Sequence, residues 1–394
     1  MSNSPYNYIP YGRQTISEQD IQAVIEVLRS PMLTQGPIVP QFEKTIAEDV
    51  NAQYGIAVNS ATSALHIACL ALGLGPGDWL WTSPISFVAS ANCGLYCGAS
   101  VDFVDIELST GLMDINHLEY KLEQAEIDGK LPKIVVPVHL AGTSCDMEAI
   151  ALLAKKYGFY VLEDASHAIG GSYKHTRVGS CYFSDICVFS FHPVKIITSG
   201  EGGMATTNDS LLAEKMYDFR SHGITKDPRR FAIHSDVPWK YEQQSLGFNY
   251  RLTDIQAALG LSQHKRLDQI VLERNRLHHA YQALFKSLDL PIRLLNVPDQ
   301  VISSVHLAVM VMLDFDPSNH LALFQYLRES LIGVQLHYSP IHLQPFYRQR
   351  GFKVGMFPRS EKYAQSAMSL PLYPGLTEQE QIRCAQSINI KLTR

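Results

Sequence analysis

Short apolar runs alternate with amphipathic segments over the first half of the chain. Seven runs have the length and composition of buried strands, at 55–58, 79–82, 101–106, 133–138, 159–162, 186–191 and 203–207. Between them, apolar residues recur with helical spacing and predict helices over 62–73, 86–97, 114–125, 146–157 and 209–221. Continuous apolar strands separated by helices are typical of a parallel sheet covered on both faces. We therefore predict an α/β fold with a mainly parallel seven-stranded sheet between helices.

Two amphipathic helices are expected before the first strand. The first begins at Ser17, which is followed three residues later by Asp20, as in a weak capping box. The second carries Phe42, Ile46 and Val50 on one face. These helices complete the set that we expect to pack around the sheet.

The remainder of the chain has an α+β pattern. Residues 223–248 are polar, contain two prolines and predict a long excursion from the sheet. The elements expected after it are a long helix, a strand, a helix, a short strand and a final helix, over about 252–285, 303–313, 318–330, 333–340 and from 378. We place a domain boundary inside the long helix. The chain should then comprise an N-terminal arm, a large domain built on the sheet and a smaller α+β C-terminal domain, at 1–14, 15–265 and 266–394.

Composition disfavours several classes of protein. Lys and Arg number 33 against 38 Asp and Glu, whereas a nucleic-acid-binding domain is usually strongly basic. No apolar run approaches the roughly 18 residues of a membrane-spanning helix, and the N-terminus lacks the features of a signal peptide. The seven cysteines show no zinc-site spacing, and we expect them to be free thiols. We expect a cytoplasmic protein that binds small molecules and other copies of itself, and neither nucleic acid nor membrane.

Polar groups follow several of the predicted strands, at the edge where open α/β sheets bind ligands. Residues 59–63 are small and lead into a helix whose free N–H groups attract an anion, although plain capping is the ordinary explanation. Phe87 either stacks on a ligand or packs in the core. Asp164 ends an apolar strand, where a capping role is again the alternative. Lys195 lies in an apolar run before “GEGG”; burial of an ammonium is costly, so the side chain either reaches water or is used chemically.

Together these groups have the chemistry that pyridoxal phosphate requires. A buried lysine can lose its proton and attack an aldehyde to form a Schiff base. Pyridoxal phosphate is such an aldehyde, and it needs a helix N-terminus for its phosphate, an aromatic face for its ring and a carboxylate at its pyridine nitrogen. Metal catalysis is disfavoured because His139, His167 and His192 lack ligand spacing. A Ser/His/Asp triad is disfavoured because no serine occupies a Gly-x-Ser-x-Gly turn.

Around these residues the sequence resembles the DegT/DnrJ/EryC1/StrS sugar aminotransferase family. Eight ordered motifs carry the resemblance over nearly the whole chain: “LTQGPIVPQFE”, “NSATSALHIACLALGLGPGD”, “SPISFVASAN”, “VHLAGTSCDM”, “LEDASHAIG”, “SFHPVKIITSGEGG”, “LGFNYRLTDIQAALG” and “HYSPIHLQPFY”. The resemblance implies the fold type I architecture of pyridoxal-phosphate-dependent aminotransferases. It also implies a homodimer whose active sites are shared between subunits.

Within the family, three stretches are most similar to one branch: “IPYGRQTI”, “SFHPVKIITSGEGG” and “DVPWKYEQQSLGFNYRLTDIQAALG”. That branch aminates a UDP-linked 4-keto-6-deoxy hexose on the pseudaminic acid pathway. The implied reaction moves an amino group from L-glutamate to C4 of UDP-2-acetamido-2,6-dideoxy-β-L-arabino-hex-4-ulose. The same scaffold serves many nucleotide sugars, so another nucleotide-linked keto sugar is the alternative substrate.

The resemblance assigns roles to individual residues. Lys195 is similar to the lysine that holds the cofactor and then shuttles a proton, and Asp164 to the partner of the pyridine nitrogen. His167 corresponds to the position beside the phenolic oxygen of the cofactor, and Phe87 to the aromatic residue that stacks on its ring. The implied phosphate-binding residues are Ala61 (through its backbone N–H), Thr62, Ser190 and, from the neighbouring subunit, Asn249.

Residues for the sugar nucleotide are less strongly indicated. In the motif at 337–342, His337 and His342 resemble residues near the sugar pocket. The diphosphate needs cations or N–H donors, for which Arg229 and Arg230 are candidates, although a solvated loop is the plainer interpretation. His222 follows a predicted helix and is a further candidate for the pocket.

Two other kinds of function stay open at this point. Some relatives use the same fold to dehydrate a sugar, and in them a histidine replaces the lysine. This chain keeps Lys195, and His192, three residues away, is no substitute. A non-catalytic regulator is the third hypothesis, and retention of both Lys195 and Asp164 argues against it.

Overall fold

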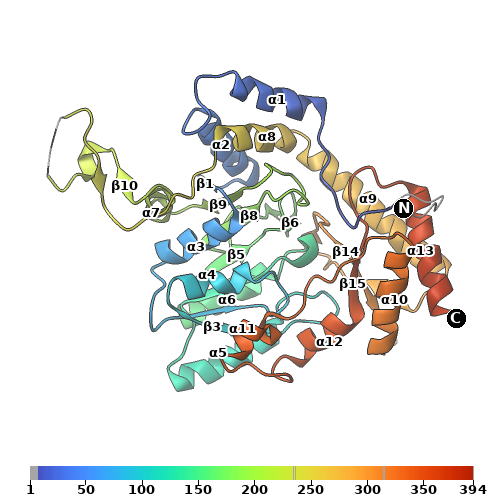
Figure 1. Ribbon diagram of the computed structural model, residues 1–394. Helices are drawn as coiled ribbons and strands as arrows, with labels where there is room; N and C mark the ends of the chain where they lie inside the picture. The colour runs from blue at the N-terminus through green and yellow to red at the C-terminus, as the bar shows by residue number, and fades with distance from the viewer. Residues whose placement is uncertain (1–7, 234, 236, 314–315, 394) are drawn as a thin grey trace.

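The computed structural model describes residues 8–233, 235, 237–313 and 316–393, and a seven-stranded sheet lies at its centre (Figure 1). Its strands are β1 (Tyr54–Val58), β2 (Trp79–Thr82), β3 (Ser100–Phe103), β4 (Ile134–Val136), β5 (Tyr160–Asp164), β8 (Ile186–Ser190) and β9 (Gly203–Thr207). The strand order is β1-β9-β8-β5-β4-β2-β3, and only β9 runs antiparallel to its neighbours. The predicted mainly parallel seven-stranded sheet is confirmed.

Helices cover both faces of this sheet, as the continuous apolar strands predicted. Alternate residues of β8 show the two faces, because Ile186 and Val188 pack in one buried cluster whereas Cys187 and Phe189 pack in another. The helices of the large sheet are α2 (Ile38–Val50), α3 (Ala61–Ala71), α4 (Ala89–Tyr96), α5 (Ile115–Asp128), α6 (Met147–Tyr157) and α7 (Ser210–Arg220). Side-chain caps set several of their starts, among them Ser60 for α3 and Asp146 for α6.

The predicted helix over about 252–285 is two helices, α8 (Asp254–His264) and α9 (Leu267–Ser287). At the break, Arg266 and Gln263 both bond the buried carboxylate of Asp20, which follows Ser17 in the capping box of α1 (Glu18–Leu28). These bonds hold α8 on α1, while α9 continues in a new direction toward the C-terminal part of the chain (Figure 1). The prediction of one continuous helix was therefore wrong, because the chain breaks between His264 and Leu267, where Gln263 and Arg266 bond Asp20.

A second, antiparallel sheet forms the C-terminal part, from β12 (Ile292–Leu294), β14 (Ala308–Met312) and β15 (Ala367–Leu370). Helices α10 (Pro317–Glu329), α12 (Pro358–Ser366) and α13 (Glu378–Leu392) accompany it, with the short α11 (Pro345–Arg348). The strand expected over 333–340 was wrong, because this stretch makes only a single bridge, Gln335 to Ser369. The third strand is β15 instead, which the sequence did not indicate.

Helix α9 contributes to both buried regions. Leu267 and Val271 pack with the large sheet, whereas Leu277 and Tyr281 pack with the C-terminal strands. The division of the chain at residue 266 stays a prediction. Residues 1–7 of the expected N-terminal arm lie outside the described residues, and from residue 8 the chain follows the C-terminal part, where Ile9 pairs with Ile332.

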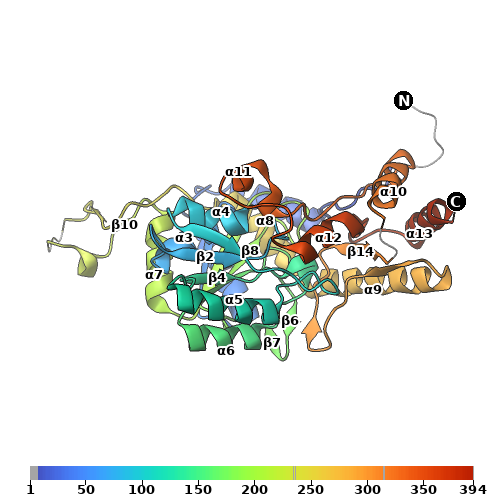
Figure 2. The same cartoon turned by 90° about the horizontal axis from the view of Figure 1, so that it is seen from below.

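The predicted excursion over 223–248 is a projecting arm that carries the small ladder β10 (Ile224–Thr225) and β11 (Glu242–Gln243). It extends away from the body on the side opposite α9 and α13 (Figures 1 and 2). Although most residues of this segment are polar, it exposes two large apolar side chains: Trp239 is 82% exposed and Leu246 is 81% exposed. The remaining short strands are β6 (Ser172–Tyr173), β7 (Thr176–Arg177) and β13 (Val301–Ile302). Among the residues described, no helix has the length and apolarity needed to cross a bilayer.

Candidate active site

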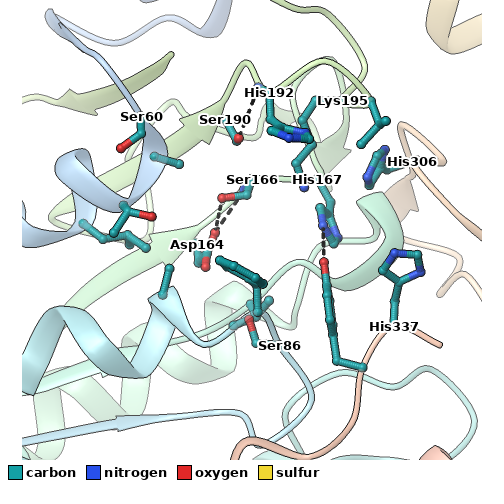
Figure 3. Close-up of a pocket in the computed structure, with 18 of the residues that line it drawn as sticks. Ser60, Ser86, Asp164, Ser166, His167, Ser190, His192, Lys195, His306 and His337 are labelled. Carbon is teal, nitrogen blue, oxygen red and sulfur yellow. Dashed lines mark hydrogen bonds between the residues drawn. The ribbon is translucent and has the colours of Figure 1, made fainter. Parts of the chain in front are cut away.

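A cavity of about 430 Å³ opens at the carboxyl ends of the parallel strands (Figure 3). Its walls come from the residues that follow β1, β2, β5 and β8, and from a C-terminal segment between His306 and Tyr338. This is the edge at which open α/β sheets bind ligands. The predicted residues Ala61, Thr62, Phe87, Asp164, His167, Ser190, Lys195 and His337 all line this cavity.

One end of the cavity has the features of an anion site. Ser60 caps helix α3 by accepting a hydrogen bond from the Ser63 N–H, and this leaves the N–H groups of Ala61 and Thr62 without a partner in the described chain. Those groups and the positive end of the helix dipole face the same space as Ser190. Gly203, in the glycine run after Lys195, contacts the start of this helix so closely that a Cβ on it would lie 2.5 Å from the Ala61 nitrogen. Glycine at this position lets the helix start close against β9.

Asp164 stands at the end of β5 and is held by three donors. The Ser90 hydroxyl donates to Oδ2 at 2.6 Å, while the Ser166 hydroxyl and backbone N–H donate to Oδ1 at 2.6 and 3.1 Å. The side chain is 6% exposed, so these bonds fix the orientation of a buried carboxyl group. Such a group can accept a hydrogen bond from a protonated ring nitrogen. Ser90 was not predicted, because it lies on α4 and meets Asp164 only in the folded chain.

Lys195 follows β8 in a turn that folds back on the strand. Its backbone N–H donates to the His192 carbonyl at 3.0 Å, and the Ser199 N–H returns to the Phe191 carbonyl at 3.0 Å. The side chain is half-buried and lines the cavity. Burial lowers the pKa of Lys195 to about 8, against the opposing effect of the nearby Asp164 carboxylate. An amine with this pKa is partly unprotonated near neutral pH and is therefore suited to nucleophilic attack and proton transfer.

Phe87 resolves one of the alternatives that the sequence left open. Its side chain is 59% exposed and lines the cavity, so it is not part of the core. The ring lies beside Tyr338, with 6.4 Å between ring centroids. An aromatic face presented to a cavity in this way is available for stacking on a flat ligand.

The end of the cavity opposite the helix terminus carries imidazoles (Figure 3). His167 accepts a hydrogen bond at Nδ1 from the Ala141 N–H at 3.3 Å, and its Nε2 lies 3.2 Å from the Tyr338 hydroxyl. Burial, followed by the charge of Lys195, holds the pKa of His167 well below its usual value. For His337, burial and then Lys195 lower the pKa to about 4. This end of the cavity is therefore polar but uncharged at neutral pH apart from Lys195.

Three residues at this end were not predicted from the sequence: His306, Tyr338 and Tyr11, whose ring centroid lies 5.5 Å from that of His337. The ring centroid of His306 lies 4.4 Å from that of His167. His306 lies inside the stretch 303–313 that was predicted as a strand, whereas strand β14 begins only at Ala308. Tyr338 lies in the stretch that we took for a strand. The motif “HYSPIHLQPFY” indicated a binding role for this stretch through His337 and His342, but not for Tyr338 itself.

Five predicted residues do not line the cavity of this single chain. His342 is buried beside Phe357 and bonds the Glu361 carboxylate at 3.0 Å, as a core histidine does. Arg229 pairs with Asp227 and Arg230 with Asp218, so both guanidinium groups already have partners. His222 and Asn249 are exposed at the root of the projecting arm. The binding roles of all five stay predictions.

The described residues hold no group of three or more His, Cys, Asp or Glu side chains that could bind a metal ion. All seven cysteines are free thiols, and six of them are buried.

Comparison with known proteins gives consistent matches over nearly the whole chain. The model of the DegT/DnrJ/EryC1/StrS aminotransferase family matches residues 14–389. The chain is 38% identical over 378 residues to the spore coat polysaccharide biosynthesis protein SpsC of Bacillus subtilis, covering 95% of this chain and 94% of the relative. It is 35% identical over 383 residues to the UDP-4-amino-4,6-dideoxy-N-acetyl-β-L-altrosamine transaminase of Campylobacter jejuni, covering 97% and 94%. Helicobacter pylori PseC, an aminotransferase involved in the biosynthesis of pseudoaminic acid, matches with a TM-score of 0.90 at 33% identity, over 98% of this chain and all of that one.

Proposed function

Because the chain belongs to the DegT/DnrJ/EryC1/StrS aminotransferase family, whose cofactor is pyridoxal 5'-phosphate, we propose a specific transamination for it. The amino group passes from L-glutamate to C4 of a UDP-linked 4-keto-6-deoxy-N-acetyl hexosamine, as on the pseudaminic acid pathway. The observation that carries amino transfer is the placement of Lys195 and Asp164 on one cavity, with a helix N-terminus at its end. The choice of sugar is supported by the names of the Campylobacter and Helicobacter relatives.

The residues present fit the cofactor. Ala61, Thr62 and Ser190 would bind its phosphate, and Phe87 would cover its ring, which explains why an aromatic side chain is 59% exposed here. Asp164, held by Ser90 and Ser166, would accept a hydrogen bond from the pyridine nitrogen. When bound, pyridoxal phosphate supplies an aldehyde carbon for the amine and a ring that withdraws electrons from the substrate carbon.

Lys195 is the proposed catalytic residue. With a pKa near 8 it accepts a proton from the substrate carbon that bears the amino group, and it later returns that proton. His167 stays neutral beside it, so this imidazole adds no positive charge next to Lys195.

We also propose a homodimer with shared active sites. The arm over 223–248 exposes Trp239 and Leu246 almost fully, and such apolar side chains on a projecting segment are typical of a contact with another copy. Asn249, at the root of the arm, would then reach the phosphate end of the partner's cavity, and His222, Arg229 and Arg230 would approach the sugar nucleotide there. Light scattering should report a dimer. A monomer that binds pyridoxal phosphate at full strength would contradict this proposal.

Another nucleotide-linked keto sugar is the alternative substrate. This alternative is supported by the Bacillus relative, which is named for spore coat polysaccharide biosynthesis. The free thiols of all seven cysteines support a reducing, cytoplasmic location for either reaction.

The deciding experiment supplies the holoenzyme with L-glutamate and a panel of UDP-, dTDP- and GDP-linked 3-keto and 4-keto sugars. We expect 2-oxoglutarate and an amino sugar in equal amounts, fastest with the UDP-linked 4-keto sugar, as measured by mass spectrometry. Faster turnover of a dTDP- or GDP-linked sugar would support the alternative. The absence of 2-oxoglutarate with every sugar would refute amino transfer from glutamate.

A further inference from the structure

A buried arginine lies behind the imidazole end of the cavity without an anionic partner. Arg274, on α9, is 2% exposed. Its Nη1 donates to the carbonyl oxygens of Val305, His306 and Leu372 at 3.2–3.3 Å, and its Nε has no partner. Burial lowers the pKa of Arg274 to about 10, so the group is still charged at neutral pH. Arg274 also borders a small void of about 10 Å³, and Lys195 is another of the residues that line it.

This charge lacks compensation within the described part of the chain. Removing a guanidinium from water costs several kcal/mol unless an anion lies close by. The acidic side chains that line the cavity are Asp164 and Glu201, and neither forms an ion pair with Arg274. A ligand that brings a negative charge to this end of the cavity would meet a field that nothing in the described protein neutralises.

His306 presents a hydrogen-bond donor at the same place. Its carbonyl accepts from Arg274, while its ring lines the cavity beside Lys195 and His167 (Figure 3). The side chain is 5% exposed, and Nδ1 is buried without a partner. A buried N–H without an acceptor is rarer than a buried lone pair without a donor, so we assign the proton of the neutral ring to Nε2. Nε2 has no hydrogen-bond partner among the residues that the structure describes, and it is therefore free to donate to a ligand.

Tyr338 supplies a second donor through its contact with His167. The Ala141 N–H donates to Nδ1 of His167, so the proton of that neutral imidazole is on Nε2 and points at the Tyr338 oxygen. The hydroxyl proton of Tyr338 is then free to turn toward the cavity. Two neutral donors and one buried cation thus converge near Lys195, which is the arrangement that a carboxylate requires.

We propose that this end of the cavity binds a carboxylate of the amino donor, with His306 Nε2 and the Tyr338 hydroxyl as donors and Arg274 as the buried counter-charge. The inference rests on the proposed function, because it takes an amino acid as the donor. The amino acid must place its nitrogen at Lys195 and carries a carboxylate on the adjacent carbon. The keto-sugar ring is uncharged at the corresponding position. The carboxylate site therefore separates the two substrates, which occupy the cavity in turn.

The test measures the binding of glutarate, a dicarboxylate without an amino group, to the holoenzyme by titration calorimetry. His306→Phe preserves ring size but removes the donor, and a hydrogen bond to a charged group is worth enough to weaken glutarate binding about 10- to 100-fold. Tyr338→Phe should weaken it in the same direction. Arg274→Gln keeps a donor for the carbonyl oxygens and removes the charge, and it should also weaken binding. His279→Phe, at an exposed position on α9, is the matched control and should bind glutarate like the unaltered protein.

Steady-state kinetics supply the second measurement. His306→Phe should raise the KM for L-glutamate by a similar factor and leave the KM for the keto sugar unchanged, a difference that general loss of structure would not produce. Unchanged glutarate binding in both His306→Phe and Arg274→Gln would overturn the inference while leaving aminotransferase activity established. If the unaltered enzyme binds glutarate through His306 but makes no 2-oxoglutarate, the carboxylate site stands and the proposed donor is wrong. If His306→Phe fails to fold, equal glutarate binding by Tyr338→Phe, Arg274→Gln and the unaltered protein refutes the proposal.

Discussion

Replacement of Lys195 by methionine should stabilise the protein in its cofactor-free form. Burial lowers the pKa of Lys195 from 10.5 to about 8 in the folded state, whereas the unfolded chain keeps the ordinary value. Since a tenfold change in an equilibrium constant corresponds to about 1.4 kcal/mol, the charged lysine costs the folded state about 3 kcal/mol. Methionine fills a similar volume without a charge, so Lys195→Met recovers most of this free energy at pH 7.

The pH dependence distinguishes this cause from a gain in packing. Below pH 8 the lysine is protonated in both states, and the full penalty is present. Between pH 8 and 10.5 the folded protein loses its proton first, and the penalty disappears as the pH rises. The advantage of Lys195→Met should therefore be greatest at pH 7 and small near pH 10.5.

Differential scanning calorimetry of the cofactor-free proteins provides the assay. For a chain of this length, 3 kcal/mol corresponds to a rise in Tm of roughly 3–6 °C, because the unfolding entropy grows with the number of residues. Lys286→Met, at an exposed lysine on α9, is the control and should shift Tm by no more than about 1 °C at either pH. Equal stability of Lys195→Met and the unaltered protein at pH 7, or an advantage that persists at pH 10.5, would refute this reasoning.

Three further predictions concern the cofactor site. Ser90→Ala removes a donor to the Asp164 carboxylate, and equilibrium dialysis should show roughly tenfold weaker binding of pyridoxal phosphate, while Ser287→Ala, at an exposed serine, leaves it unchanged. Gly203→Ala places a methyl group against the start of α3, and it should weaken cofactor binding and lower the free energy of unfolding by about 1–3 kcal/mol. Gly75→Ala is the control and should change neither quantity, because no atom lies within 4 Å of the added methyl group. Equal changes in the two variants would exclude the proposed close approach of α3 to Gly203. If Asn249 serves the partner's site, Lys195→Ala and Asn249→Ala should each be inactive alone. A heterodimer of the two variants contains one intact site, so refolding them together should restore about a quarter of the activity of the unaltered enzyme. No recovery would mean that Asn249 acts within its own subunit.

The strands and their order of appearance were predictable because a buried parallel strand has few alternatives to a continuous apolar run. Asp164 and Lys195 could be found because they follow such strands directly. Strand β15, with the sequence “AMSL”, could not be found, since four residues without a pattern acquire their conformation from the neighbouring β14. The break between α8 and α9 depends on Asp20, which lies more than two hundred residues earlier in the chain.

The residues that the sequence did not indicate act through tertiary contacts. Ser90 is an ordinary serine in a helix until the fold brings it to Asp164. Arg274 occupies a helical position that typically suits a solvated cation, and only the structure shows it 2% exposed among carbonyl oxygens. The apolar side chains of the arm were visible in the sequence, but their exposure was not, because prolines and charges dominate that segment.

The two ends of the cavity come from separate stretches of chain, with the phosphate and ring contacts between 60 and 195 and the imidazole contacts mostly between 306 and 338. The contacts for the vitamin-derived group and the proposed contacts for the nitrogen donor are thus encoded by different portions of the gene. A duplicated copy can accumulate changes in the later portion and accept another donor without losing its reagent.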